Sequence, residues 1–256
     1  MTDPTANGVR LEVDGTIARI TLDRPHQHNA LRAEDVSMLR AFFDEIEGDD
    51  AVRAVFLTGS GERTFCAGAS LEQMESGEIS GRVFDTLTDR LAHLSRPTVC
   101  ALNGSVYGGG AELALCCDFR IGTPEVRLSV PAARLGVCYP VGGLSRYVRR
   151  LGLPVSSRIL LAAEELDAEE LHRIGYLTHL VDRSELGDAG ETLVVRLASL
   201  APLAVRSMKR IMLDLSDGVV DEVTASELID RCVRSDDLRE GLTARREGRE
   251  PEFEGR

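Results

Sequence analysis

Apolar and polar residues follow different spacings in successive stretches of this chain, and each spacing predicts an element. Val9–Val13 and Ile17–Leu22 have the composition of strands, and the Asp14-Gly15 pair between them accepts positive φ, which predicts a hairpin. From about Ala33 to Glu47, apolar residues recur every three or four positions, the spacing of an amphipathic helix. An apolar strand, Ala54–Gly59, follows this helix. Strand, helix and strand in this order predict a parallel pair joined by a crossover helix.

This alternation continues to about residue 190 and then changes. The polar stretch Glu72–Ser80 contains Gly77 and is predicted to be mobile. From Glu191 onward helical spacing dominates and strand signals are few. We therefore predict an α/β fold with a β/α core over residues 1–190 and a helical region over residues 191–256. Further helices are predicted at Val83–Leu94, Leu153–Ala163 and Ala168–Ile174, and further strands at Phe119–Ile121, Arg127–Val130 and Thr178–Val181.

The stretch Thr98–Cys117 carries the first sign of chemistry. It is predicted to form a buried strand to Leu102, a glycine-rich turn over Asn103–Gly110 and a helix from Ala111. The first turn of a helix has free N–H groups and a partial positive charge, which favour a negative oxygen. Glu112 lies three residues after Gly109 and shares its helix face. This is half of a site for enolate chemistry, although close packing alone explains the glycines equally well.

The other half is predicted in Ala54–Leu71. An apolar strand there ends at Gly59-Ser60-Gly61, and the small residues of Phe65–Ala69 follow in a loop. Small side chains let a main-chain N–H approach a ligand closely. Two such turns predict two N–H donors on one oxygen, which is an oxyanion hole. The glycines match neither the P-loop nor the dinucleotide-binding pattern, since no Lys-Ser/Thr follows them and Leu113 replaces the last glycine of the latter.

Motifs spread over about residues 9–254 resemble the crotonase (enoyl-CoA hydratase/isomerase) superfamily. Their order and spacing carry the resemblance more than any single motif does. The matching segments are Arg24-Pro25 with Asn29-Ala30-Leu31, Phe65–Ala69, Asn103-Gly104 with Gly108–Ala114, Leu135-Gly136 with Gly142-Gly143, and Arg239–Leu242 with Pro251-Glu252-Phe253.

The resemblance implies a crotonase-like ββα spiral core with a C-terminal helical trimerisation region, assembled as a homotrimer or a dimer of trimers. It also implies that the backbone N–H groups of Ala69 and Gly109 bind a thioester carbonyl oxygen. Glu112 matches the first of two glutamates that hydratases of the family use. The second position is occupied by Ala132, whose methyl group can neither move a proton nor hold a water.

The resemblance also implies where an acyl-CoA thioester binds. Coenzyme A is expected along Arg24–Leu31, which includes Ala30, and along the loop Ala67–Leu71. Arg24 is expected to face the phosphates of CoA, and His26 is a weaker candidate for that role. Ser70 replaces an Asp found in many relatives, which affects that side-chain contact. Ala67 and Leu71 are expected beside the adenine and pantetheine, and Tyr139 is expected to line the acyl pocket.

Three functions stay open on these residues. Glu112 alone is compatible with a 2-enoyl-CoA hydratase, and equally with a Δ3-Δ2-enoyl-CoA isomerase that carries one proton and needs no water. The third is a catalytically silent acyl-CoA-binding protein, which would need no carboxylate in the thioester pocket. We predict the hydratase, with no cofactor beyond the CoA of the substrate.

Composition limits the classes of partner that the protein can bind and the cellular compartment in which it is expected. A net charge of −12 argues against nucleic acid and anionic membranes as general partners. The segment Met1–Gly8 lacks the apolar core of a signal peptide, and no apolar run is long enough to span a bilayer. The six cysteines form no C-x-x-C pair, which predicts reduced thiols in a cytoplasmic protein. No metal site is predicted, since His26 and His28 lack a third ligand nearby.

Overall fold

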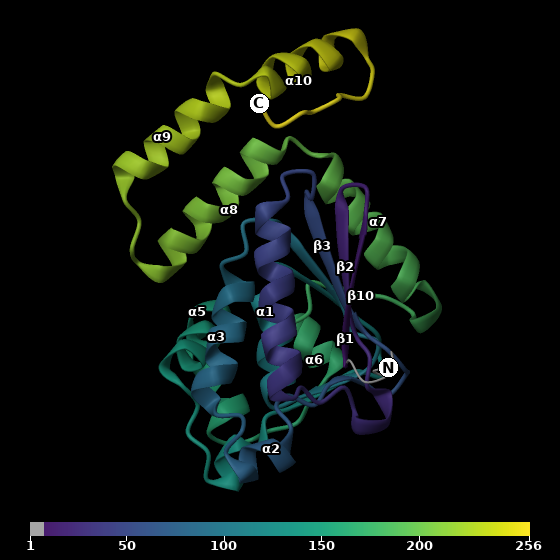
Figure 1. Ribbon diagram of the computed structural model, residues 1–256, viewed down its shortest axis with the longest axis vertical. Helices are drawn as coiled ribbons and strands as arrows, with labels where there is room; N and C mark the ends of the chain where they lie inside the picture. The colour runs from purple at the N-terminus through teal and green to yellow at the C-terminus, as the bar shows by residue number, and fades with distance from the viewer. Residues whose placement is uncertain (1–7) are drawn as a thin grey trace.

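The computed structural model of the protein describes residues 8–256. The predicted polar segment Met1–Gly8 therefore lies outside the described residues, except for Gly8. The described chain forms two sheets flanked by helices (Figure 1). The larger sheet has the order β1-β2-β3-β5-β7-β10, and the smaller has the order β4-β6-β8-β9. The strands are β1 (Val9–Asp14), β2 (Ile17–Leu22), β3 (Ala54–Gly59), β4 (Thr64–Cys66), β5 (Thr98–Ala101), β6 (Ser105–Tyr107), β7 (Phe119–Gly122), β8 (Arg127–Ser129), β9 (Leu166–Asp167) and β10 (His179–Leu180).

The order of strands in the two sheets is that of a ββα spiral. β3, β5 and β7 lie in the large sheet, and each is followed by a short strand, β4, β6 or β8, in the small sheet. Pairing is parallel from β2 through β10 and from β4 through β8. Among the strands of residues 8–256, β1 with β2 and β8 with β9 are the antiparallel pairs, and the first of these is the predicted hairpin. The parallel crossover predicted between β2 and β3 is also confirmed.

The helices follow the turns of the spiral and then leave it. Figure 1 shows α1 and α3 side by side on one side of the large sheet, α7 on the other, and α8 to α10 beyond the core. They are α1 (Ala33–Gly48), α2 (Leu71–Ser76), α3 (Gly81–Ala92), α4 (Gly109–Cys116), α5 (Val141–Leu160), α6 (Ala168–Arg173), α7 (Leu186–Ser199), α8 (Pro202–Asp217), α9 (Glu222–Val233) and α10 (Asp236–Glu247), with 3-10 turns η2 (Pro25–Gln27), η3 (Pro131–Leu135) and η4 (Arg183–Glu185).

Hydrophobic burial explains why α1 lies where it does. Val36, Leu39, Phe43 and Ile46 recur on one face of this helix and are all buried in the main core. Burying a side chain of this size contributes about 1.5–3 kcal/mol each, so the helical periodicity seen in the sequence is also the packing face. A second, smaller cluster lies under α7, around Val194.

One local prediction is wrong, one stays untested, and one is confirmed only for part of a longer element. The glycine-rich turn Asn103–Gly110 contains β6, because this short strand pairs with β4 and β8 in the second sheet. The mobility predicted for Glu72–Ser80 stays a prediction. This stretch includes most of α2, which Ser70 caps by accepting a hydrogen bond from the Gln73 N–H and which Gly77 ends at φ 81°. The helix predicted from Leu153 is confirmed as the second part of α5, because the backbone is not helical at Gly152, where φ is 78°. The first part of α5, from Val141 to Gly152, was not predicted.

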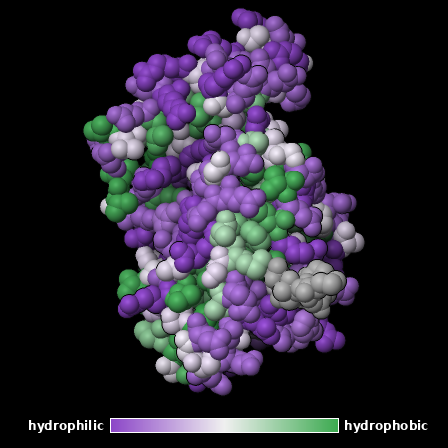
Figure 2. Space-filling view, in the orientation of Figure 1, coloured by the Kyte–Doolittle hydropathy of each residue, from purple (hydrophilic) through white to green (hydrophobic). Residues whose placement is uncertain are grey.

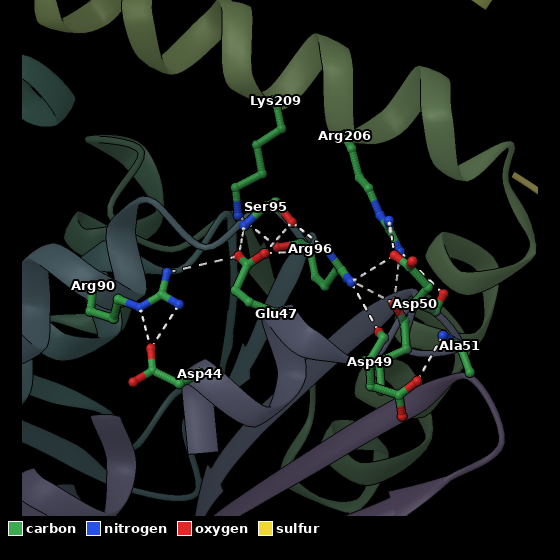
Figure 3. Close-up of polar contacts among 11 residues, drawn as sticks. Asp44, Glu47, Asp49, Asp50, Ala51, Arg90, Ser95, Arg96, Arg206 and Lys209 are labelled. Atoms are coloured by element: carbon green, nitrogen blue, oxygen red, sulfur yellow. Dashed lines mark hydrogen bonds and ion pairs between the residues drawn. The ribbon is translucent and has the colours of Figure 1, made fainter. Parts of the chain in front are cut away.

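Two basic side chains attach α8 to the core (Figure 3). Lys209 Nζ donates to the Arg96 carbonyl oxygen at 2.8 Å and to Asp118 Oδ2 at 2.6 Å, and only 5% of Lys209 is exposed. Arg206 donates to the Val52 carbonyl oxygen at 3.1 Å and to Asp50 Oδ1 at 3.2 Å. The C-terminal helices are therefore joined to the core by polar contacts as well as by the chain.

The boundary predicted after residue 190 falls inside α7, which packs on β3 and β5, and the division into core and tail stays a prediction. Beyond α8, no residue of α9 and only Asp237 and Ala244 of α10 are buried. Figure 2 shows hydrophobic residues exposed on the surface where α8 turns into α9. Across residues 8–256, none of the helices combines the length and hydropathy needed to cross a bilayer.

Candidate active site

A cavity of about 540 Å³ opens where the two glycine-bearing turns meet. Side chains from α2, the start of α3, η3 and the loop before α5 complete its walls. Most of the lining is apolar, and Glu112 and Glu72 are its two acidic residues. The lining residues are Gln27, His28, Ala30, Ala67, Ala69, Ser70, Leu71, Glu72, Met74, Ser80, Gly81, Phe84, Tyr107, Gly108, Gly109, Glu112, Pro131, Ala132, Leu135, Val137, Tyr139 and Pro140.

The backbone amides of Ala69 and Gly109 lie on the two turns that meet in this cavity. Gly68, at φ +87°, is so close to the second turn that a Cβ on it would lie 2.6 Å from the Gly109 nitrogen. Hydrogen bonds of 2.8 Å from the Leu31 N–H to the Gly68 carbonyl, and from the Ser70 N–H to the Leu31 carbonyl, fix the backbone around Ala69. Within residues 8–256, neither the Ala69 nor the Gly109 N–H donates to an acceptor of the protein. Two unpaired donors therefore border one cavity.

Glu112 is in the first turn of α4 and lines the same cavity, although only 3% of the residue is exposed. Its position near the helix N-terminus favours a negative charge. Burial has the larger effect and raises the pKa of the Glu112 carboxyl, while the neighbouring Arg146 guanidinium partly offsets this rise. A carboxyl whose pKa is raised in this way is a stronger base when ionised than an exposed one, which suits it to proton transfer.

Arg146 is the residue of this site that the sequence did not single out. It lies on α5, three residues after Gly143, and donates to Glu112 Oε1 from Nη2 at 2.7 Å and from Nε at 3.2 Å. Its Nη2 also donates to Asp85 Oδ1 at 2.5 Å and to Thr88 Oγ1 at 2.7 Å on α3. The matched segment Gly142-Gly143 was the one signal near it, and nothing in the spacing links α5 to Glu112.

A protein-family model described as enoyl-CoA hydratase/isomerase matches residues 12–256. The chain belongs to this family, and with it to the crotonase superfamily.

Curated relatives agree with this assignment over nearly the whole chain. A short-chain-enoyl-CoA hydratase of Clostridium acetobutylicum is 34% identical over 245 residues, covering 93% of this chain and 94% of the relative. A crotonyl-CoA hydratase of Syntrophomonas wolfei is 30% identical, covering 95% of this chain and 96% of the relative. A carnitinyl-CoA dehydratase of Proteus mirabilis is 32% identical, with 98% of this chain and the whole relative covered.

Solved structures of the family share the fold. An enoyl-CoA hydratase from Bacillus anthracis aligns with a TM-score of 0.88 at 28% identity, over 98% of this chain and 100% of that chain. An enoyl-CoA hydratase/carnithine racemase from Magnetospirillum magneticum aligns with a TM-score of 0.91 at 27% identity, over 98% of this chain and 96% of that chain. The predicted crotonase-like ββα core is thereby confirmed.

Arg24, which was expected to face the phosphates of CoA, is buried and is absent from the cavity lining. The residue is 6% exposed, and its guanidinium pairs with the fully buried Asp35, with one hydrogen bond of 3.2 Å to Oδ1 and a shorter one to Oδ2. It also donates to the Ala30 carbonyl oxygen at 3.2 Å. Since a buried, paired guanidinium cannot reach a solvated phosphate, Arg24 joins the Arg24–Leu31 loop to α1.

His26 is exposed on η2 and is absent from the cavity lining, whereas its neighbours Gln27 and His28 line the cavity. The His28 ring contacts Thr64 Oγ1 at 2.9 Å through Nδ1. Arg32, which the sequence did not single out, donates to Gln27 Oε1 at 3.2 Å and so lies close to the cavity. Among residues 8–256, no cluster of three or more His, Cys, Asp or Glu side chains is placed to hold a metal ion.

The other residues expected in the substrate site do line the cavity, namely Ala30, Ala67, Ser70, Leu71, Ala132 and Tyr139. Tyr139 meets the buried Tyr147 edge to face, with ring centroids 6.2 Å apart. Burial raises the pKa of the Tyr139 hydroxyl, so it stays neutral. Ala132 lies on η3, and its methyl leaves this wall of the cavity without a second carboxylate.

Proposed function

We propose that this protein is a 2-enoyl-CoA hydratase that adds water across the 2,3 double bond with Glu112 as its only acid and base. The observation that carries the proposal is the pair of unpaired backbone N–H groups, of Ala69 and Gly109, bordering the cavity that Glu112 lines. Relatives named as short-chain-enoyl-CoA and crotonyl-CoA hydratases support the same reaction.

In the proposed reaction, the amides of Ala69 and Gly109 bind the thioester oxygen. Ionised Glu112 takes a proton from water, and the hydroxyl oxygen bonds to C3. The electrons of the double bond move toward the thioester oxygen, where the two N–H groups stabilise the enolate; each such donor contributes about 3–4 kcal/mol to a transition state of this kind. Protonated Glu112 then returns the proton to C2. Because one carboxylate serves both carbons, the hydroxyl and the new hydrogen are added to the same face.

Two parts of the cavity lining are proposed to contact the two parts of the substrate, CoA and the acyl group. Ala30, Ala67 and His28 are proposed to contact the CoA portion, and Arg32, which donates to the lining residue Gln27, is proposed to meet its phosphates. Tyr139 and the other apolar residues around Glu112 are proposed to hold the acyl group. No cofactor beyond the CoA of the substrate takes part in this reaction.

A second candidate is a Δ3-Δ2-enoyl-CoA isomerase, which the Ala132 methyl favours. Moving one proton between C2 and C4 needs one carboxylate and no bound water, so a single Glu112 suffices. A silent acyl-CoA-binding protein is less well supported. Such a protein gains nothing from a buried carboxylate held by Arg146, since burying that charge is unfavourable.

Absorbance of the conjugated double bond separates these functions. The purified protein is given a 2-enoyl-CoA and, separately, a 3-enoyl-CoA. Loss of conjugation from the first supports the hydratase, and its appearance from the second supports the isomerase. Glu112→Gln should bind acyl-CoA within a few-fold of the wild type and lose turnover. Full turnover by that variant would remove Glu112 from the mechanism, and binding without either reaction would favour the silent protein.

We further propose that the chain assembles as a homotrimer or a dimer of trimers through α8 to α10. Large apolar side chains on these helices are exposed in the single chain, which is unfavourable in water unless another surface covers them. They include Met208, Met212, Leu215, Val223, Ile229, Val233 and Leu242. Light scattering on the purified protein would give the mass of three or six chains, and a monomer mass would contradict the proposal. The cytoplasmic location stays a prediction.

A further inference from the structure

The buried carboxylate of Glu112 raises a physical problem that one glutamate cannot solve by itself. A base must be ionised and correctly oriented, yet burial favours the neutral carboxyl of Glu112. With Ala132 at the second position, no carboxylate stands there to share the proton or hold a water, and the other acidic residue of the cavity, Glu72, is exposed on α2. Some other group must therefore fix Glu112 in its working state.

Arg146 contacts the carboxylate in a way that treats its two oxygens differently. Both hydrogen bonds from the guanidinium, at 2.7 and 3.2 Å, end on Oε1, and Oε2 receives none from it. Gly143, one helical turn earlier on α5, lets the helix approach the carboxylate, since a Cβ there would lie 3.0 Å from Oε2 and 3.1 Å from Oε1. One oxygen is anchored, and the other stays free to exchange a proton.

The Arg146 guanidinium is itself held in place by α3 and is shared between two carboxylates. Asp85 Oδ1 accepts from the same Nη2 that binds Glu112, and Thr88 Oγ1 accepts from it as well. Arg146 is largely buried and does not line the cavity, so it acts from behind Glu112. Because Asp85 takes part of the positive charge, Arg146 holds the Glu112 carboxylate without making it too weak a base. The groups that face Glu112 from the surrounding elements are Arg146, Asp85, Tyr139, Tyr147 and Cys116, and Asp89 faces Arg146.

We propose that Arg146 is a positioning residue, shared between Asp85 and Glu112, that anchors Glu112 Oε1 and leaves Oε2 to carry the proton for both half-reactions. This proposal rests on the proposed function, because it assigns the proton transfer to Glu112. It explains how a site with one carboxylate can work in a family where hydratases use two. Arg146 acts through Glu112 and touches no reacting atom.

The dependence of kcat on pH tests this assignment, because substitutions of Arg146 and of Asp85 should shift it in opposite directions. Arg146→Gln removes the cation, so the acidic limb of the kcat profile should move to higher pH and kcat at pH 7 should fall about 100-fold, with KM changed less than threefold. Asp85→Asn frees the guanidinium for Glu112, so the same limb should move to lower pH. Arg146→Lys should recover part of kcat. The matched control, Arg149→Gln, removes a neighbouring arginine of α5 that pairs with Asp217, and its profile should match the wild type.

A second measurement needs no turnover. Glutamate labelled with ¹³C at the side-chain carboxyl reports the Glu112 titration, assigned by its absence in Glu112→Gln. The titration should move up in Arg146→Gln and down in Asp85→Asn. If Arg146→Gln does not fold, as judged by circular dichroism, Asp85→Asn still decides the sign. Unshifted or equally directed titrations overturn the proposal even in an active enzyme. A wild type without turnover would instead overturn the proposed function, while the labelled carboxyl would still report on Arg146.

Discussion

Gly68→Ala tests the central geometry of the proposed site. The substitution adds one methyl group on the turn before Ala69, at a position where φ is +87°. The added Cβ would lie 2.6 Å from the Gly109 nitrogen and 3.0 Å from its Cα, and both atoms belong to rigid backbone. Contacts under 3.0 Å are not tolerated, so the two turns must separate.

The expected loss follows from how little separation is needed. Moving one turn by about half an ångström is enough to relieve the contact, and it also moves one N–H donor away from the oxygen that both donors share. A misplacement of about 1 Å can reduce a rate about 100-fold, and removing an oxyanion donor reduces kcat about 100- to 1,000-fold. We therefore expect kcat of Gly68→Ala to fall about 100-fold, with a smaller change in KM.

Gly77→Ala is the matched control for the strain of an alanine at positive φ. Gly77 has φ +81° and ends α2, but a Cβ there meets no atom within 4 Å. Both variants should lose roughly 1–2 kcal/mol of stability from the left-handed backbone. Loss of the conjugated enoyl absorbance at saturating substrate, with urea unfolding measured in parallel, separates strain from catalysis. Equal kcat values for the two variants would refute the two-amide site.

Three further outcomes are expected. Ala132→Glu should raise hydration of a short 2-enoyl-CoA, because it restores a second carboxylate to the cavity wall; an unchanged rate would show that this wall does not face the reacting carbons. Lys209→Met should lower the free energy of unfolding by about 2–3 kcal/mol in urea, because Asp118 loses its cation, whereas Arg210→Met, in an exposed pair, should change it by less than about 0.5 kcal/mol. Burial raises the pKa of Glu112, so its stabilising contribution is present at low pH and lost as pH rises through that pKa; Glu112→Gln should therefore gain stability over the wild type between pH 4 and pH 7, and a constant difference would contradict this sign.

Much of the fold could be predicted because its signals are local. The period of α1 and the Asp14-Gly15 turn are properties of neighbouring residues, and both elements formed as predicted. β6 was missed because three residues are too few to show a period, and its pairing with β4 and β8 connects distant segments. The first part of α5, from Val141 to Gly152, was also missed, whereas the part predicted from Leu153 does begin after the break at Gly152.

For the candidate site too, the features carried by contiguous motifs could be predicted, and those that depend on contacts between distant segments could not. The glycine turns and Glu112 are contiguous motifs, so the chain alone determined which backbone amides and which carboxylate were available, and also that Ala132 leaves the second position without one. Tertiary structure alone decided what surrounds them. It buried Arg24 against Asp35, although its motif suggested phosphate binding, and it brought Arg146 from α5 to Glu112 on α4. A guanidinium at the end of a long side chain takes whichever carboxylate the fold places within reach, and that distance is set by packing between helices rather than by sequence spacing.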